Sequence, residues 1–383
     1  MSDKVLITKR QAPQARQDPH RSLHSETGAL AREHPGRSGN PLVKVVGLAW
    51  LEFEKPDLVR AERFLVDFGF TVADRTPEAL VLRGHWAGTP SLVVRRGAGS
   101  RFVGPAFAAD ARADLERLAR ATDGTVRPHG GGHAVELTDP SGIPVRVVHG
   151  VPEMPALPER DPLPLNVGTH PLRANATQRP ARRAAQIQRL GHVVLGTTRF
   201  RAALDWYLDT LGLIVSDFLY LDGQRERGPV MAFIRCDLGS VPSDHHTLAM
   251  ALQPRTGYVH SAYQLTDLDE VAAAGEYLRE RGYRHSWGIG RHILGSQIFD
   301  YWRDPDRLMF EHYTDGDLFD CSMEPGWAPM SASGLSQWGP KATAEFTGAR
   351  EPGVVLAAIK ALTDKGNEVD FAALRGLVKA MAS

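Results

Sequence analysis

Cysteine is scarce in this chain of 383 residues, which contains only Cys236 and Cys321. Two thiols so far apart in sequence give neither a disulfide framework nor a thiolate metal site, so a reducing cytoplasm is the expected compartment. Excess charge is also absent, because 45 Lys and Arg residues balance 45 Asp and Glu residues. This balance argues against nucleic acid or an anionic membrane as a partner. No apolar run approaches the roughly 18 residues of a membrane helix, and none follows the N-terminal basic residues as in a secretory signal.

Composition divides the chain into five segments. Residues 1–41 are rich in Arg, His, Pro and Ser, which indicates an N-terminal arm. Residues 151–186 contain many Pro, Arg and Asn residues without sustained periodicity, which predicts a linker. The length suits two domains, 42–150 and 187–320. A helical extension is expected over 321–383, with helices at Val354–Lys365 and Phe371–Met381.

A pattern of one strand, one helix and about three strands recurs through both domains. In the first domain it begins with a strand at Val43–Phe53. In the second it begins with a strand at Leu190–Thr197 and a helix at Phe200–Leu211, and it restarts with a strand at Tyr258–Leu265 and a helix at Leu268–Arg281. Four βαβββ units therefore predict an α+β fold, in which antiparallel sheets curl around a shared cavity.

Two histidines and one glutamate occupy matching places in this repeat. His192 and His260 lie in the first strands of the third and fourth units, and Glu311 lies in the last strand of the fourth. A carboxylate buried alone in a sheet is costly, and a cation is the usual reason to keep one. Two imidazoles and one carboxylate on one face are the ligands of non-haem Fe(II) oxygenases. Taken singly, each residue is better interpreted as an ordinary polar strand residue, but together, at matched positions, the three favour a metal.

Over residues 42–320 the chain resembles the type I extradiol ring-cleavage dioxygenases of the vicinal-oxygen-chelate superfamily, which include the catechol 2,3-dioxygenases and the 2,3-dihydroxybiphenyl 1,2-dioxygenases. The resemblance rests on Gly191-His192, on the segment from Asp244 to Ala249 followed by His260, and on a longer signature. That signature runs from Gly290-Arg291-His292 through Tyr301 and Asp304-Pro305 to Glu311. Two positions depart from the pattern: Asp300 replaces an apolar residue, and Arg307 replaces a glycine. Both departures bear on substrate identity more than on metal binding.

The resemblance implies the chemistry. Fe(II), with Mn(II) as the alternative, would be bound by His192, His260 and Glu311. His246 would be the acid–base residue, and His292 and Tyr301 would hydrogen-bond the diol oxygens. The expected substrates are a catechol-type diol and O2, with both oxygen atoms entering a ring-opened product, and a homo-oligomer is expected.

The N-terminal domain cannot assemble the same site, because Gly47-Leu48 is read as the counterpart of Gly191-His192, and Val145-Arg146 stands where the carboxylate is needed. We interpret this domain as metal-free and structural. By strand alternation, His245 should face away from the side that His246 faces.

Two other functions are compatible with the sequence. One is an aryl-pyruvate dioxygenase, which also uses Fe(II) but acts on a 2-oxo acid; the spacing from His292 to Tyr301 to Glu311 argues against it. The other is a non-catalytic protein of the same fold that sequesters aromatic ligands. Such a protein has no need of iron, nor of His246, His292 and Tyr301 together.

Overall fold

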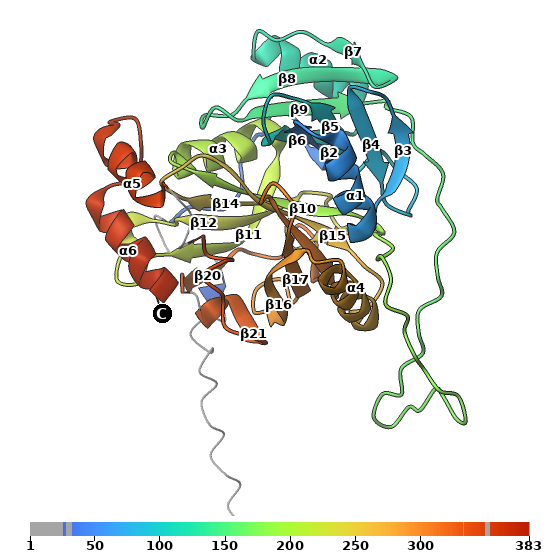
Figure 1. The fold of residues 1–383 in the computed structure, drawn as a ribbon. Helices are drawn as coiled ribbons and strands as arrows, with labels where there is room; N and C mark the ends of the chain where they lie inside the picture. Colours follow the sequence, from blue (N-terminus) through green and yellow to red (C-terminus); the bar gives the residue numbers. More distant parts are fainter. Residues whose placement is uncertain (1–25, 28–32, 332, 349–352, 383) are drawn as a thin grey trace, which may run out of the picture.

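The computed structural model describes residues 26–27, 33–331, 333–348 and 353–382, so most of the expected N-terminal arm lies outside the described residues. Two β-sheet domains lie one above the other in Figure 1, and the linker crosses between them along one side. The four βαβββ units predicted from the sequence are present, two in each domain.

The N-terminal domain is an eight-stranded sheet in the order β3-β4-β5-β2-β6-β9-β8-β7. Its elements are β2 (Val45–Lys55), α1 (Leu58–Phe68), β3 (Thr71–Arg75), β4 (Ala79–Arg83), β5 (Leu92–Arg96), β6 (Arg101–Ala109), α2 (Arg112–Ala121), β7 (Arg127–His129), β8 (Gly132–Thr138) and β9 (Pro144–His149).

The C-terminal domain repeats this arrangement in its central strands, in the order β11-β12-β14-β10-β15-β18-β17-β16. Its elements are β10 (Arg189–Thr197), α3 (Phe200–Leu211), β11 (Leu213–Tyr220), β12 (Met231–Cys236), β13 (Ser243–Asp244), β14 (Leu248–Leu252), β15 (Gly257–Gln264), α4 (Leu268–Glu280), β16 (Arg284–His292), β17 (Ile298–Arg303), β18 (Met309–Thr314) and β19 (Leu318–Phe319).

Both large sheets are mixed, whereas the sequence predicted antiparallel ones. The first strand of each unit lies parallel to the last strand of the same unit, as in the pairs β10–β14 and β15–β18. The helix after the first strand carries the chain back across the sheet, so the next strand starts in the same direction as the first. Two antiparallel turns then return the last strand parallel to the first.

Helix α1 fixes the position of β18, the strand that carries Glu311. The side chain of Asp57 accepts a hydrogen bond from the backbone N–H of Arg60 and so caps the helix. The apolar face of α1 packs on the C-terminal domain, with the Phe64 ring 5.5 Å from the Phe310 ring. The Nε2 of His312 donates to the Phe68 carbonyl oxygen at 2.7 Å, at the end of the helix. The two domains therefore share one continuous core.

A buried ion pair ties the domains together a second time. Lys55, at the end of β2, contacts Asp304 and Asp306 in the turn between β17 and β18. The side chains of Lys55 and Asp304 are 3% and 4% exposed. Asp304 also accepts hydrogen bonds from the backbone N–H groups of Asp306 and Leu308, so one carboxylate holds both its own turn and the neighbouring domain.

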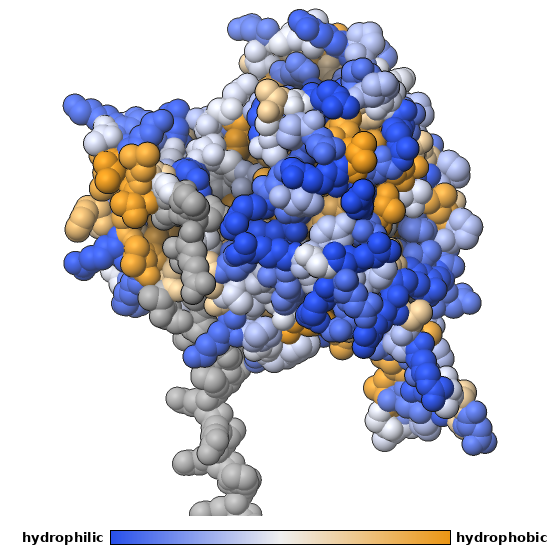
Figure 2. Space-filling view, in the orientation of Figure 1, coloured by the Kyte–Doolittle hydropathy of each residue, from blue (hydrophilic) through white to orange (hydrophobic). Residues whose placement is uncertain are grey.

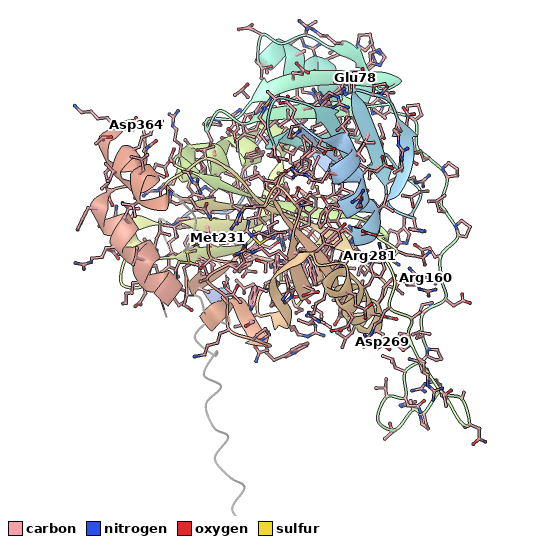
Figure 3. The ribbon with its side chains drawn as sticks, viewed as in Figure 1. Glu78, Arg160, Met231, Asp269, Arg281 and Asp364 are labelled. Carbon is pink, nitrogen blue, oxygen red and sulfur yellow. The ribbon has the colours of Figure 1, made fainter. Side chains whose placement is uncertain are left out.

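The linker predicted at 151–186 contains no helix or named strand among the described residues, and it loops away from the body of the molecule. It is anchored at Arg160, labelled in Figure 3, whose guanidinium bonds the side chains of Gln186 and Glu270. The end of the linker returns into the core, where Ile187 is fully buried.

The segment after residue 320 begins with strands, although a helical extension was expected there. Strand β20 (Gly326–Pro329) pairs with β11 and also with β1 (Glu26–Thr27), and β21 (Ser336–Trp338) pairs with β16. Both strands are short. Each forms by pairing with the exposed edge of a longer strand, so its own residues give no clear strand pattern.

The two expected helices follow, as α5 (Val354–Thr363) and α6 (Phe371–Ala382). Figure 2 shows apolar side chains gathered over this pair, where Leu356, Phe371 and Val378 are exposed. Among the described residues, no helix is both long and apolar enough to cross a membrane.

Candidate metal centre

Strand register sets His192, Glu311 and Tyr301 in one row across the C-terminal sheet. His192 on β10 pairs with Ala262 on β15, Ala262 pairs with Glu311 on β18, and Glu311 pairs with Tyr301 on β17. His260 lies two residues before Ala262 and so projects from the same face. Because Ala262 carries only a methyl group, it leaves open the space between His192 and Glu311.

The three side chains converge on one point. The Nε2 atoms of His192 and His260 lie 3.3 and 3.2 Å from Oε2 of Glu311, and one ligand atom from each residue lies within 4.8 Å of the others. Glu311 is fully buried, yet among the described residues neither of its carboxylate oxygens has a hydrogen-bond partner. A buried carboxylate without partners beside two imidazoles fits a divalent cation, and oxygen and imidazole ligands suit Fe(II) or Mn(II).

Electrostatics favours an ionised glutamate at this point. Burial alone would raise the pKa of Glu311, but His192 and His260 hold that pKa well below its ordinary value. Burial lowers the pKa of His260, which keeps its imidazole neutral and able to bind a metal.

A mostly apolar cavity opens beside His192 and His260, while Glu311 lies buried behind them. Besides the two histidines it is lined by Val194, Leu219, Met231, Phe233, His246, His292, Leu294, Gln297, Tyr301, Ala328, Pro329, Ser331, Gly334, Leu335 and Phe346. Met231, labelled in Figure 3, marks the strand β12 that forms one wall. The other predicted site residues, His246, His292 and Tyr301, therefore line the same cavity as the candidate ligands His192 and His260.

The region after residue 330 closes this cavity. The Nδ1 of His292 donates to the carbonyl oxygen of Leu335 at 2.7 Å, which leaves Nε2 to accept from the hydroxyl of Tyr301 at 2.9 Å. The ring of Phe346 packs 4.9 Å from that of Tyr301. Burial lowers the pKa of His292 to about 4, so its imidazole is neutral near pH 7.

Comparison with known proteins agrees with this geometry. Residues 189–312 match the Glyoxalase/Bleomycin resistance protein/Dioxygenase superfamily. Metapyrocatechase 2 of Cupriavidus necator is 34% identical over 299 residues, which cover 75% of this chain and 87% of that protein. This chain belongs to the extradiol ring-cleavage dioxygenases. An iron-dependent extradiol dioxygenase of Rhodococcus jostii is 27% identical over 40% of this chain and 50% of its own length.

Solved structures share the fold of this dioxygenase. Homoprotocatechuate 2,3-dioxygenase from Arthrobacter globiformis aligns with a TM-score of 0.64 at 19% identity, covering 81% of this chain and 93% of that one. A Mn(II)-bound glyoxalase from Novosphingobium aromaticivorans gives 0.64 at 21% identity, covering 79% and 94%. The two-domain α+β fold of repeated βαβββ units is therefore confirmed.

The two departures from the family pattern lie away from the cavity of the dioxygenase. The carboxylate of Asp300 accepts from His285 and from Trp302 Nε1, each at 2.7 Å, on the side of β17 opposite Tyr301. Arg307 has φ 73°, a left-handed conformation that explains why glycine is usual there. Neither residue lines the cavity, so neither alters the substrate pocket directly.

The N-terminal domain of the dioxygenase has an equivalent row, but the sequence comparison of its first strand was wrong by two residues. Trp50 pairs with Ala106, Ala106 with Arg146, and Arg146 with Glu136. Trp50 therefore stands where the C-terminal domain has His192; the residue assigned to that place, Leu48, pairs one step away with Phe107. A bulge in β2 shifted the register. Arg146, as expected, replaces the glutamate.

His246 lines the cavity and His245 does not, as predicted, although both lie between β13 and β14 and not in a strand. Its Nδ1 is 3.0 Å from Nδ1 of His246, and its Nε2 is 2.7 Å from Oδ2 of Asp217. Asp217 is a site contact that the sequence analysis missed. It lies in β11, which is distant in sequence, and only the sheet order brings it beside His245.

Proposed function

We propose that this dioxygenase binds Fe(II) through His192, His260 and Glu311 and uses O2 to open the ring of a catechol-type diol next to the two hydroxyl groups. The observation that carries the proposal is the Glu311 carboxylate, which has no hydrogen-bond partner within the described part of the chain and lies beside two buried imidazoles. Those imidazoles line a cavity together with His246 and Tyr301. Both atoms of O2 would enter the ring-opened semialdehyde acid.

Fe(II) bound by one face of three protein ligands would leave about three positions for the two diol oxygens and O2, and it would act as a template and Lewis acid. Mn(II) has similar ligand preferences and is the alternative metal. Within this cavity the protein supplies orientation, proton transfer and exclusion of water.

His246 is proposed to accept a proton from the diol and to return one later in the reaction. Its ring lies 3.9 Å from that of His192, so it stands beside the metal position without being one of the three converging ligands. Burial, followed by the neighbouring histidines, lowers the pKa of His246 well below its ordinary value, which favours a neutral imidazole that can act as a base.

His292 and Tyr301 are proposed to hydrogen-bond the diol oxygens. In the structure they bond each other, at 2.9 Å, so each group is already oriented toward the cavity. With its proton on Nδ1, His292 can accept a hydrogen bond from a diol hydroxyl at Nε2. The Tyr301 hydroxyl, once it turns away from His292, can donate to a deprotonated diol oxygen.

The walls of the cavity favour an uncharged substituent on the diol. No Lys, Arg, Asp or Glu is among the described residues that line it, and most of the lining side chains are aliphatic or aromatic. A carboxylate placed there would lose its hydration without gaining a cation, which is unfavourable. We therefore propose catechols with alkyl or aryl substituents as substrates, in preference to catechols with acidic side chains.

Anaerobic loading with Fe(II), followed by air and matched diols, tests the function. We expect one O2 consumed per diol and a yellow product with catechol, 3-methylcatechol and 4-methylcatechol, and a kcat/KM lower by about 10-fold or more for 3,4-dihydroxybenzoate. Stoichiometric iron with no O2 uptake for any diol would contradict the proposed reaction. Equal rates for the methyl and carboxyl compounds would contradict only the proposed pocket preference. Loading with Mn(II) in parallel identifies the working metal.

The scarcity of cysteine supports a cytoplasmic site for this reaction, and a homo-oligomer stays a prediction to be tested by sedimentation.

A further inference from the structure

A line of hydrogen bonds runs from strand β11 to the cavity through Asp217, His245 and His246. Oδ2 of Asp217 lies 2.7 Å from Nε2 of His245, and Nδ1 of His245 lies 3.0 Å from Nδ1 of His246. The three residues are 7%, 1% and 4% exposed. Each contact therefore lies where water competes little for the hydrogen bond.

The chemistry of the groups fixes the direction of these bonds. An ionised carboxylate only accepts hydrogen bonds, so Nε2 of His245 must carry the proton. A neutral imidazole with its proton on Nε2 has a lone pair on Nδ1. The 3.0 Å contact between the two Nδ1 atoms then needs its proton from His246, which leaves Nε2 of His246 unprotonated.

We propose that Asp217 and His245 are positioning residues that hold His246 in the tautomer whose Nε2 accepts the proton of the diol. The proposal rests on the proposed function, in which His246 is the base. Without the line, the proton of a neutral His246 could sit on either nitrogen, and the Nε2–H form could not act as a base toward the substrate.

The surrounding contacts hold the His245 ring in this role. The backbone N–H of His245 donates to the Asp317 carbonyl oxygen at 2.8 Å, and the Ser216 hydroxyl donates to the His245 carbonyl oxygen. Gly295 lies against the ring, so closely that a Cβ there would come 2.9 Å from Nδ1 of His245. The rings of Phe233 and Phe319 each pack 5.4 Å from the His245 ring. A residue that only filled space would not need both ring nitrogens of His245 to meet polar partners.

The test compares side chains of similar size that differ in whether they accept a hydrogen bond. His245→Leu removes the acceptor for His246 Nδ1, His245→Asn restores an amide oxygen near it, and Asp217→Asn removes the carboxylate. His285→Asn serves as the matched control, because His285 forms an equally short 2.7 Å bond to Asp300 but does not line the cavity. Iron content, kcat and KM for 3-methylcatechol are measured on the Fe(II)-loaded full chain. Anaerobic binding of 4-nitrocatechol, whose visible spectrum reports its ionisation, is recorded for each variant.

We expect His245→Leu and Asp217→Asn to keep full iron and a KM within about twofold, and to lose roughly 10- to 100-fold in kcat, the usual effect of residues that orient another functional group. They should also bind 4-nitrocatechol in a less ionised form than the wild-type protein does. His245→Asn should recover most of the activity, and His285→Asn should match the wild-type protein.

A wild-type kcat and a wild-type nitrocatechol spectrum in both Asp217→Asn and His245→Leu would overturn the inference. If His245→Leu does not fold, Asp217→Asn against the His285→Asn control decides alone. His246→Ala separates the two levels: normal turnover in it would reject His246 as the base, whereas lost turnover there with unaffected Asp217 and His245 variants would reject only the positioning line.

Discussion

Replacing Lys55 by Met should destabilise the whole protein, because it leaves the buried carboxylate of Asp304 without its cation. Lys55 and Asp304 are 3% and 4% exposed and come from different domains. Removing one partner of a buried ion pair typically costs about 3 to 5 kcal/mol. Asp304 keeps two backbone N–H donors on its other oxygen, so we expect a loss near the lower end, about 3 kcal/mol.

The loss of unfolding free energy in Lys55→Met should also depend on pH. Burial raises the pKa of Asp304 above its ordinary value of 3.8, and Lys55 is the group that counteracts this rise. A carboxyl with a raised pKa binds its proton more tightly in the folded chain. Its contribution to the free energy of unfolding is therefore greatest below pH 3.8 and is lost as the pH rises through the folded value. In Lys55→Met that folded value moves higher still, so the deficit should shrink on acidification.

Urea denaturation of the metal-free chain at pH 7 and at pH 5 measures both effects. Lys44→Met is the matched control, since Lys44 pairs with Asp237 but is 53% exposed, and such surface pairs contribute about 1 kcal/mol or less. A loss in Lys55→Met no larger than that of the control would refute the assignment of a buried clamp between the domains.

Three other substitutions probe the cavity. Ala262→Leu should abolish iron binding while the fold stays intact, because the leucine side chain would fill the space between His192 and Glu311. Iron analysis and circular dichroism measure the two effects. Full iron content would show that this space is not the metal position. Glu311→Ala should likewise bind no iron, and normal iron content in it would exclude the glutamate as a ligand. Phe346→Ala should raise KM for methylcatechols by about 10-fold, from the loss of roughly 1.5 kcal/mol of apolar contact at the cavity wall, with kcat changed less.

The repeated fold could be predicted from the sequence because each βαβββ unit carries its own local signals. The amphipathic pattern of Phe200–Leu211 predicted the helix that became α3, and the apolar runs at Leu190–Thr197 and Tyr258–Leu265 predicted β10 and β15. The short strands β20 and β21 could not be predicted, because their pairing is decided by the exposed edges of β11 and β16 and not by their own residues.

Much of the candidate metal centre was also fixed by sequence. His192, His260 and Glu311 occupy matching strands of repeated units, so the repeat itself indicates one shared face, and the structure brings them within 4.8 Å. The spacing from His292 to Tyr301 to Glu311 follows three successive antiparallel strands, β16, β17 and β18, and the register pairs Tyr301 with Glu311. Local periodicity and repeat symmetry were sufficient for these residues.

Only the tertiary structure decided the remaining parts of the site. Asp217 on β11 contacts His245, which lies between β13 and β14. Ala262 matters because His192 and Glu311 pair on either side of it, and Phe346 enters the cavity from beyond the repeated units. In the N-terminal domain a bulge places Trp50, not Leu48, opposite Ala106. Strand order, bulges and the docking of distant segments depend on contacts far apart in the chain, and a local pattern carries no record of them.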